Sequence, residues 1–370
     1  MLIKRIELRY IKMELVAPFV TSMGVETHEE HIIIRVESDG VTGWGECVAQ
    51  GNPFYSYETV NTAWHILRDY LIPSLLGKKI VSIDEAIGFC ARVRGHRMAK
   101  AGLEAALSDA FAKEKKLPLS EMLGGVRDRI DVGVSIGMQE STSVLLQKAA
   151  DYLEEGYKRI KIKIEPGNDL ELIAAIRREY PEIPFQVDAN CSYQLSDVDA
   201  FRAMDHYGLL LIEQPLGYDD LYDHSRLQQE LETPICLDES IQSLSDSRAA
   251  LELKSCRSIN IKPGRVGGFT ESKAIHDFCA SKSIAVWHGG MLESGIGRAG
   301  NVALASLPNF KLPGDISASD RYYKQDIVDP PFRVLPDGTM VVPTKPGIGV
   351  DVLMEQLNRV TQHHEDFTAT

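Results

Sequence analysis

Five short strand-like segments between residues 161 and 262 each end in a charged residue, at nearly equal intervals. They read RIKIKIE, FQVDAN, LLLIEQP, ICLDES and INIKPG. The charged residues are Lys163, Asp188, Glu213, Asp238 and Lys262, which follow one another at intervals of 25, 25, 25 and 24 residues. This regularity predicts a repeated structural unit with one functional residue in each copy.

The interval matches one strand, loop, helix and loop of a parallel β/α barrel, in which eight such units occupy about 250 residues. One charged residue per unit then lies at the carboxyl end of its strand, and all five face one mouth. Apolar strands alternating with amphipathic helices begin at residues 130–136, and further strands are expected at 284–287 and around 312–316. The barrel is expected over residues 126–320, with one helix missing or replaced because this span is short.

Residues 1–125 are expected to form a separate α+β domain. Period-2 alternation in IKRIELRYIKMEL and HIIIRVESDGVTGWGECV predicts an antiparallel meander. Helical periodicity predicts helices at 59–72, 82–94 and 98–114, the first of them stopped by Pro73. Residues 321–370 contain Pro-rich loops, a predicted hairpin at 336–338 and the helix-like segment VDVLMEQLNRVTQ. We expect this tail to return to the first domain.

The net charge and the cysteines indicate which kinds of partner the protein binds and in which cellular compartment it works. The net charge of −13 and the pI near 5.3 argue against nucleic acid or an anionic membrane as the partner, because either would repel such a surface. A small molecule is favoured instead. The six cysteines include no CxxC pair and are interpreted as reduced thiols. The N-terminus lacks the apolar run of a signal peptide, so we expect a cytoplasmic protein.

Three carboxylates of the series form a candidate metal site. Asp188, Glu213 and Asp238 would project together from neighbouring strand ends, where their mutual repulsion is costly without a cation. Oxygen ligands with no histidine or cysteine among them favour Mg²⁺ over zinc and leave positions for water and a substrate carboxylate, and Mn²⁺ can substitute. Each acid alone would fit a helix N-cap after a strand, but three acids in register favour the metal.

Lys161 and Lys163 lie two residues apart in a strand, so both side chains point to the same side while the flanking isoleucines point to the other. Alone, this KxK pair would better fit an edge strand with solvated lysines. The isoleucines and the distant Lys262 favour placing both lysines inside the barrel. Burial would then lower the pKa of a lysine and make it a usable base near neutral pH.

These positions supply the parts for removing a proton next to a carboxylate. Such a proton is very weakly acidic, so its removal requires a cation that stabilises the enediolate and a positioned base. Lys163 and Lys262 would approach opposite faces of a substrate whose carboxylate is held by the metal between them.

With these motifs the chain resembles the enolase superfamily. KIK, VDAN, IEQP, LDES and NIKPGRVGG are similar to the muconate lactonizing enzyme subgroup. HGGMLESGIGRAGNVALASLPNF, at residues 288–310, is similar to the o-succinylbenzoate synthase and N-acylamino acid racemase family. The resemblance spans essentially the whole chain. It implies a homo-oligomer of α/β fold, a (β/α)7β modified TIM barrel under an α+β capping domain formed by both ends of the chain.

The resemblance also implies roles for individual residues. Lys163 would take the α-proton in a syn dehydration that gives o-succinylbenzoate for menaquinone synthesis, and Lys262 would stabilise the enediolate as a cation, with Lys161 in the same catalytic set. In racemisation Lys163 and Lys262 would exchange roles. The implied substrate contacts are Phe19, Met23, Tyr55, Ser135, Asn190, Gly290 and Met291. Core packing is the simpler interpretation of the large apolar residues among them.

Other functions remain open at this level. A dedicated N-succinylamino acid racemase or a muconate cycloisomerase-like enzyme would use the same catalytic set. A dipeptide epimerase is disfavoured, because Asp315-Ile316-Ser317 stands where an Asp-x-Asp is expected. Gly300 also departs from the histidine that is common in close relatives. A non-catalytic ligand-binding barrel is the remote alternative, and the complete set of lysines and carboxylates argues against it.

Overall fold

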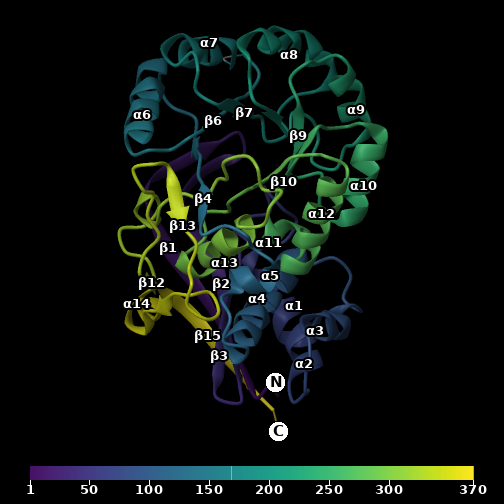
Figure 1. Ribbon diagram of the computed structural model, residues 1–370, viewed down its shortest axis with the longest axis vertical. Helices are drawn as coiled ribbons and strands as arrows, with labels where there is room; N and C mark the ends of the chain where they lie inside the picture. The colour runs from purple at the N-terminus through teal and green to yellow at the C-terminus, as the bar shows by residue number, and fades with distance from the viewer. Residues whose placement is uncertain (168, 370) are drawn as a thin grey trace.

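Two sheets organise the chain (Figure 1). The computed structural model describes residues 1–167 and 169–369. One part is a curved parallel sheet with helices along its outer side, and the other contains an antiparallel sheet that both ends of the chain share. None of the helices in the described part of the chain has the length and apolar character needed to cross a bilayer.

The parallel sheet has seven strands in the order β11-β10-β9-β8-β7-β6-β5. Their residues are buried on both faces, which explains the short runs rich in isoleucine and valine. The strands are β5 (Val134–Ile136), β6 (Ile160–Lys163), β7 (Phe185–Asp188), β8 (Ile212–Glu213), β9 (Ile235–Leu237), β10 (Ser258–Ile261) and β11 (Val286–His288). The helices are α6 (Thr142–Glu154), α7 (Asp169–Glu179), α8 (Val198–Met204), α9 (Tyr222–Gln229), α10 (Leu244–Leu253), α11 (Pro263–Val266), α12 (Phe269–Ser281) and α13 (Gly295–Ala305).

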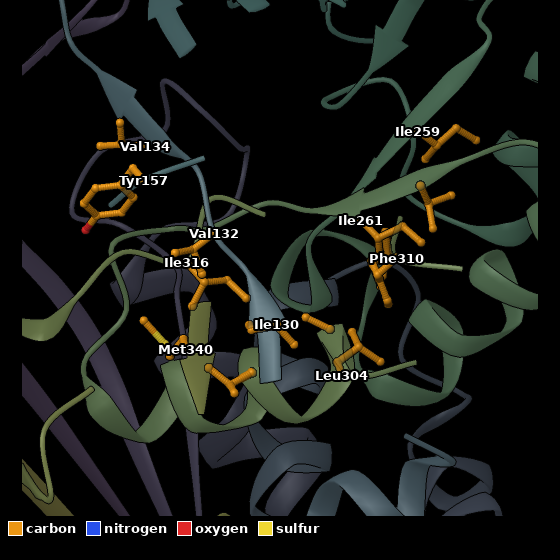
Figure 2. Close-up of a cluster of buried hydrophobic side chains, with 14 of the residues drawn as sticks. Ile130, Val132, Val134, Tyr157, Ile259, Ile261, Leu304, Phe310, Ile316 and Met340 are labelled. Atoms are coloured by element: carbon orange, nitrogen blue, oxygen red, sulfur yellow. The ribbon is translucent and has the colours of Figure 1, made fainter. Parts of the chain in front are cut away.

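The strand predicted around residues 312–316 is not formed, although the segment fills the eighth position of the barrel. The N–H of Asp315 donates to His288 of β11 at 2.8 Å, and Gly314 accepts from the N–H of Gly133 at 2.8 Å. Pro313 has no N–H, which prevents a continuous ladder here. Figure 2 shows Ile316 near Val132, within the buried cluster that joins the two ends of the sheet. The expected modified barrel is therefore confirmed, with an irregular closing segment.

The antiparallel sheet has the order β15-β1-β2-β3 and confirms the predicted meander. Its strands are β1 (Arg5–Thr21), β2 (Gly24–Ser38), β3 (Val41–Cys47) and β15 (Thr361–Thr368). Helices α1 (Val60–Ile66), α2 (Ile72–Leu75), α3 (Ile83–Cys90), α4 (Arg97–Glu114) and α5 (Leu119–Leu123) accompany it. A Cβ added to Gly43 would lie 2.1 Å from the carbonyl oxygen of Ala106, so only glycine allows β3 to pack this closely on α4. We call this part of the molecule the cap.

Pro73 does not end the first helix, contrary to the prediction. A π-helical turn at Leu67–Leu71 joins α1 to α2, and Pro73 lies in the first turn of α2. The wider turn shifts the hydrogen-bond pattern, so the missing N–H of the proline falls where a new helix begins.

The tail returns to the cap as predicted, but with different elements. The predicted helix is confined to α14 (Met354–Val360), and the chain then forms β15, which pairs with β1 from Thr368 opposite Arg5. The two termini therefore lie close together (Figure 1).

A turn forms at residues 335–339, but β13 (Thr339–Val341) pairs with β4 (Arg129–Asp131), so the predicted hairpin is wrong. The remaining strands are β12 (Val328–Asp329) and β14 (Asp351–Val352). The domain limits at residues 125 and 320 stay predictions.

The buried carboxylate of Glu46, in β3, joins the cap to the barrel. It accepts hydrogen bonds from the N–H of Ser294 at 3.0 Å, from the Ser294 hydroxyl at 2.6 Å and from the N–H of Gly297 at 2.8 Å. These N–H groups belong to the first turn of α13, where helices leave donors unsatisfied. Nδ1 of His31 lies 2.7 Å from the same carboxylate. Burial opposes both charges, but this contact keeps the pKa of His31 raised and that of Glu46 lowered.

We predict that Glu46→Ala lowers the free energy of unfolding by about 3 kcal/mol, because several buried donors lose their acceptor and each such loss costs about 1–3 kcal/mol. Glu355→Ala, in the exposed part of α14, is the control and is expected to change the value by less than about 0.5 kcal/mol. Urea unfolding followed by circular dichroism measures both. Equal midpoints for the two variants would show that Glu46 does not hold the cap on the barrel.

Candidate active site

A cavity with about 730 Å³ of empty space lies at the mouth of the barrel, under loops of the cap. All seven residues that the family resemblance placed around the substrate line it, together with the three lysines. The seven are Phe19, Met23, Tyr55, Ser135, Asn190, Gly290 and Met291. Met291 also packs in the core of the cap, which agrees with the simpler interpretation of this residue. Contact of these residues with a substrate stays a prediction.

The register of the parallel strands brings the three carboxylates together. Lys163 of β6 pairs with Asp188 of β7, and Asp188 pairs with Glu213 of β8. Glu213 pairs with Cys236 of β9, so Asp238, two residues later, points to the same side. The nearly equal spacing in the sequence therefore puts Lys163, Asp188 and Glu213 side by side at the carboxyl ends of their strands, with Asp238 two residues further along.

The lysines are buried in this layer and form ion pairs with the carboxylates. Nζ of Lys163 lies 2.7 Å from Oδ2 of Asp188, and Nζ of Lys161 lies 2.8 Å from Oε2 of Glu213. Nζ of Lys262 lies 2.8 Å from Oδ2 of Asp238. The flanking isoleucines of β6 lie in the hydrophobic core, which agrees with the predicted orientation of the KxK pair.

The pKa shifts of Lys161 and Lys262 differ in sign from the prediction. Burial by itself would lower the pKa of both ammonium groups. The carboxylates of Asp315 and Glu213 outweigh burial and raise the pKa of Lys161, and Asp238 does the same for Lys262. Burial, with the charge of Asp188, raises the pKa of Glu213 to about 8. The prediction rested on desolvation of the lysines, reinforced by the neighbouring lysine and a bound metal, and it omitted their ion pairs with the acids.

The three carboxylates fit Mg²⁺ in their chemistry, but their side chains do not converge on one point in this arrangement. They offer only oxygen donors at the ends of neighbouring strands. Burial and the charge of Asp188 raise the pKa of Glu213, whereas nearby lysines outweigh burial and lower the pKa values of Asp188 and Asp238. Among residues 1–167 and 169–369, no three acidic, histidine or cysteine side chains surround a common point that would suit a metal ion. Lys161 lies between two of the acids, 3.1 Å from Asp188 and 2.8 Å from Glu213. Metal binding therefore requires these side chains to rearrange, and it stays a prediction.

Lys163 and Lys262 lie on opposite sides of the mouth. β6 and β10 are separated by β7, β8 and β9 in the sheet order, and both lysines line the same cavity. The hydroxyl of Tyr55 accepts from Nζ of Lys262 at 3.1 Å and donates to Asp238 at 2.9 Å. A Cβ at Gly289 would lie 2.7 Å from Cε of Lys262, so glycine at this position leaves room for the lysine side chain.

The sequence interpretation missed several buried partners of the carboxylates. Nδ2 of Asn260 donates to Glu213 at 2.7 Å and lies 3.2 Å from Asp238, and Arg265 also donates to Asp238. Asn260 precedes Lys262 by two residues in a strand, so the alternation that placed the KxK pair could also have identified it. The contacts of Arg265 have no comparable signal in the sequence.

Asp315 was considered above only as part of the segment that stands in place of an Asp-x-Asp motif. In the structure it forms ion pairs with two buried cations. Its carboxylate lies 2.6 Å from Nζ of Lys161 and 2.7 Å from the fully buried guanidinium of Arg159. Both of its oxygens are therefore engaged by cations of the barrel interior.

Gly300 lies on α13, where an added Cβ would be 2.7 Å from the ring of Phe269, so a larger side chain would displace that ring.

Known proteins with similar sequences and structures share this architecture. Residues 5–124 match the N-terminal domain of the mandelate racemase/muconate lactonizing enzyme family, and residues 144–356 match the enolase C-terminal domain-like family. An o-succinylbenzoate synthase from Geobacillus stearothermophilus is 50% identical over 369 residues, which cover 100% of this chain and 98% of that protein. An N-succinylamino acid racemase from Amycolatopsis sp. is 48% identical over 357 residues, or 96% of each chain.

A solved structure agrees with these sequence matches. The crystal structure of an enolase superfamily member from Listeria innocua Clip11262 is similar to the whole fold with a TM-score of 0.97, at 41% identity and 100% coverage of both chains. Sequence and structure therefore agree over the cap and the barrel alike. The chain belongs to the mandelate racemase/muconate lactonizing enzyme family of the enolase superfamily.

Proposed function

We propose that this protein is a Mg²⁺-dependent o-succinylbenzoate synthase, which dehydrates 2-succinyl-6-hydroxy-2,4-cyclohexadiene-1-carboxylate. The observation that carries the proposal is that two buried lysines line one cavity from opposite sides, Lys163 paired with Asp188 and Lys262 paired with Asp238. Full-length similarity to o-succinylbenzoate synthases supports this substrate. Similarity to N-succinylamino acid racemases supports racemisation of N-succinylamino acids in the same site as a second activity.

Asp188, Glu213 and Asp238 would hold the Mg²⁺, and Mn²⁺ can replace it. When bound, the cation would neutralise negative charge that develops on a substrate carboxylate. The acids proposed as ligands also raise the pKa of Lys161 and Lys262. Engaging these acids elsewhere therefore weakens the main effect that raises the pKa of Lys262, whereas Asp315, the largest contributor for Lys161, stays beside that lysine.

Lys163 would act as the base in the dehydration. Its Nζ takes the proton from the α-carbon and returns it to the hydroxyl group that departs from the same face, which leaves as water. Lys262 stays protonated on the opposite face and stabilises the negative charge that forms next to the carboxylate. The cap residues Phe19 and Met23 line the cavity, and over a bound substrate they would limit the access of bulk water.

We also propose that the enzyme works in the cytoplasm as a homo-oligomer. All six cysteines are free, and five of them are buried, which suits a reducing compartment. The oligomer rests on the family resemblance, and sedimentation of the purified protein would establish its size.

The proposed function is tested by turnover of 2-succinyl-6-hydroxy-2,4-cyclohexadiene-1-carboxylate, followed by the loss of its diene absorbance. We expect rapid turnover with Mg²⁺ and its loss with a chelator, because three carboxylates without their cation repel the substrate carboxylate. N-succinylamino acid racemisation is measured alongside by polarimetry. Racemisation without dehydration, in protein shown by calorimetry to bind Mg²⁺, would contradict the synthase and make a dedicated racemase the better assignment.

Lys163→Ala is expected to lower the rates of dehydration and racemisation by about 10²–10⁴-fold, the usual contribution of a positioned general base. Lys158→Ala is the matched control, because Lys158 belongs to the same segment but forms an exposed ion pair with Asp131. Steady-state rates and circular dichroism are compared for both variants. A folded Lys163→Ala protein with wild-type rates would exclude Lys163 as the base.

A further inference from the structure

Asn190 connects the proposed base to a buried carboxylate that the mechanism does not yet use. Nζ of Lys163 donates to Oδ1 of Asn190 at 2.5 Å, and Nδ2 of Asn190 donates to Oε1 of Glu239 at 3.0 Å. Both Asn190 and Glu239 are more than nine-tenths buried. The three side chains come from the ends of β6, β7 and β9, so the chain of contacts crosses the mouth of the barrel.

The two contacts of Asn190 require opposite ends of its amide. An ammonium group only donates, so Lys163 requires the amide oxygen, and the Oε1 acceptor of Glu239 requires the amide nitrogen. The backbone of Asn190 has a φ of 40°, in the left-handed region that asparagine tolerates better than most residues. Its N–H also donates to Oδ1 of Asp188 at 3.1 Å. The backbone and both ends of the amide are therefore fixed.

We propose that Glu239 is a positioning residue for Lys163, which acts by fixing the amide of Asn190 so that its oxygen faces Nζ. Lys163 has two acceptors here, Asn190 and Asp188. Asp188 belongs to the proposed metal ligands, so Asn190 is the acceptor that stays available when Asp188 is engaged. This inference rests on the proposed function, because it assigns the base of that reaction.

Lys262 does not share this hydrogen-bonded support, although the charge of Glu239 also acts on it. Its Nζ contacts Asp238 and the hydroxyl of Tyr55, and neither group hydrogen-bonds to Asn190 or Glu239 in the described structure. Loss of the Glu239 contact should therefore affect the face of the substrate that Lys163 serves and spare the other face. A general loss of folding or metal affinity would affect both faces alike.

Glu239 also lines a second cavity, which shares Phe54 and Tyr55 with the first. This side cavity has about 670 Å³ of empty space, and Gln242 lies in its wall. Oε2 of Glu239 is buried and has no hydrogen-bond partner in the described part of the chain. A substitution at Glu239 therefore breaks one known contact, the one with Asn190, and Gln242→Met serves as a control in the same cavity.

The test compares solvent deuterium exchange at the α-carbon of the two enantiomers of an N-succinylamino acid, by proton NMR at saturating Mg²⁺. Lys163→Ala identifies the enantiomer whose proton Lys163 removes. In Glu239→Met we expect exchange of that enantiomer to fall at least about tenfold, because small displacements of a reacting group have large effects on rate. Exchange of the other enantiomer is expected to stay within about twofold of the wild type, as for both enantiomers in Gln242→Met.

The variant Glu239→Gln shows whether Glu239 acts by orienting the amide of Asn190 or through its negative charge. Its amide oxygen can still accept from Asn190, so we expect exchange of the Lys163 enantiomer within about threefold of the wild type, although the negative charge is gone. Equal losses for both enantiomers in Glu239→Met, or no loss for either, would overturn the positioning role. A loss in Glu239→Gln as large as that in Glu239→Met would also overturn it.

Failure of the proposed function has a different signature. A wild-type enzyme that exchanges neither enantiomer would contradict the proposed racemase activity, and loss of diene absorbance tests the synthase separately. Crystal structures of the wild type and Glu239→Met would then decide the positioning role. We expect Oδ1 of Asn190 within hydrogen-bond distance of Nζ of Lys163 in the wild type and turned away from it in the variant. An unchanged contact in Glu239→Met would overturn the inference.

Discussion

Buried charges of opposite sign at the mouth of the barrel are the interaction on which this site depends. Removing an ion from water costs several kcal/mol even after relaxation, so such groups persist only with close partners. Asp188 and Asp238 each contact more than one cation, and Lys161 contacts three carboxylates. The parallel sheet supplies these partners because it brings the charged residues at the carboxyl ends of neighbouring strands together. The strand ends that build the parallel sheet therefore also carry the charged residues of the site.

The cap completes this arrangement through acids of its own. Glu46 accepts from the first turn of α13, and Glu104 of α4 accepts from the N–H and hydroxyl of Thr270 at the start of α12, both at 2.8 Å. Burial raises the pKa of Glu104 to about 7. In both cases a buried carboxylate of the cap satisfies helix donors of the barrel. The loops that cover the cavity are thereby held over it by polar contacts with strict geometry.

The sequence predicted the features that follow from periodicity. The strand ends, the orientation of the KxK pair and the meander are local patterns of period two or of one β/α unit. The strand β15 escaped prediction because Thr361–Thr368 is stabilised by pairing with β1, from which it is separated by most of the chain. The closing segment at 312–316 and the sign of the lysine pKa shifts depend on contacts between distant residues, which no local pattern contains. The roles of the site residues toward metal and substrate still await experiment.

The central claim is that three carboxylates hold a divalent cation and that two lysines face a substrate carboxylate from opposite sides. A crystal structure with Mg²⁺ and o-succinylbenzoate tests it most directly. We predict a cation bound by Asp188, Glu213 and Asp238, with Lys161 displaced from between the acids. We also predict a product carboxylate at the cation, with Lys163 and Lys262 on its two sides. A cation held by other residues, or a product bound outside the cavity, would contradict the account.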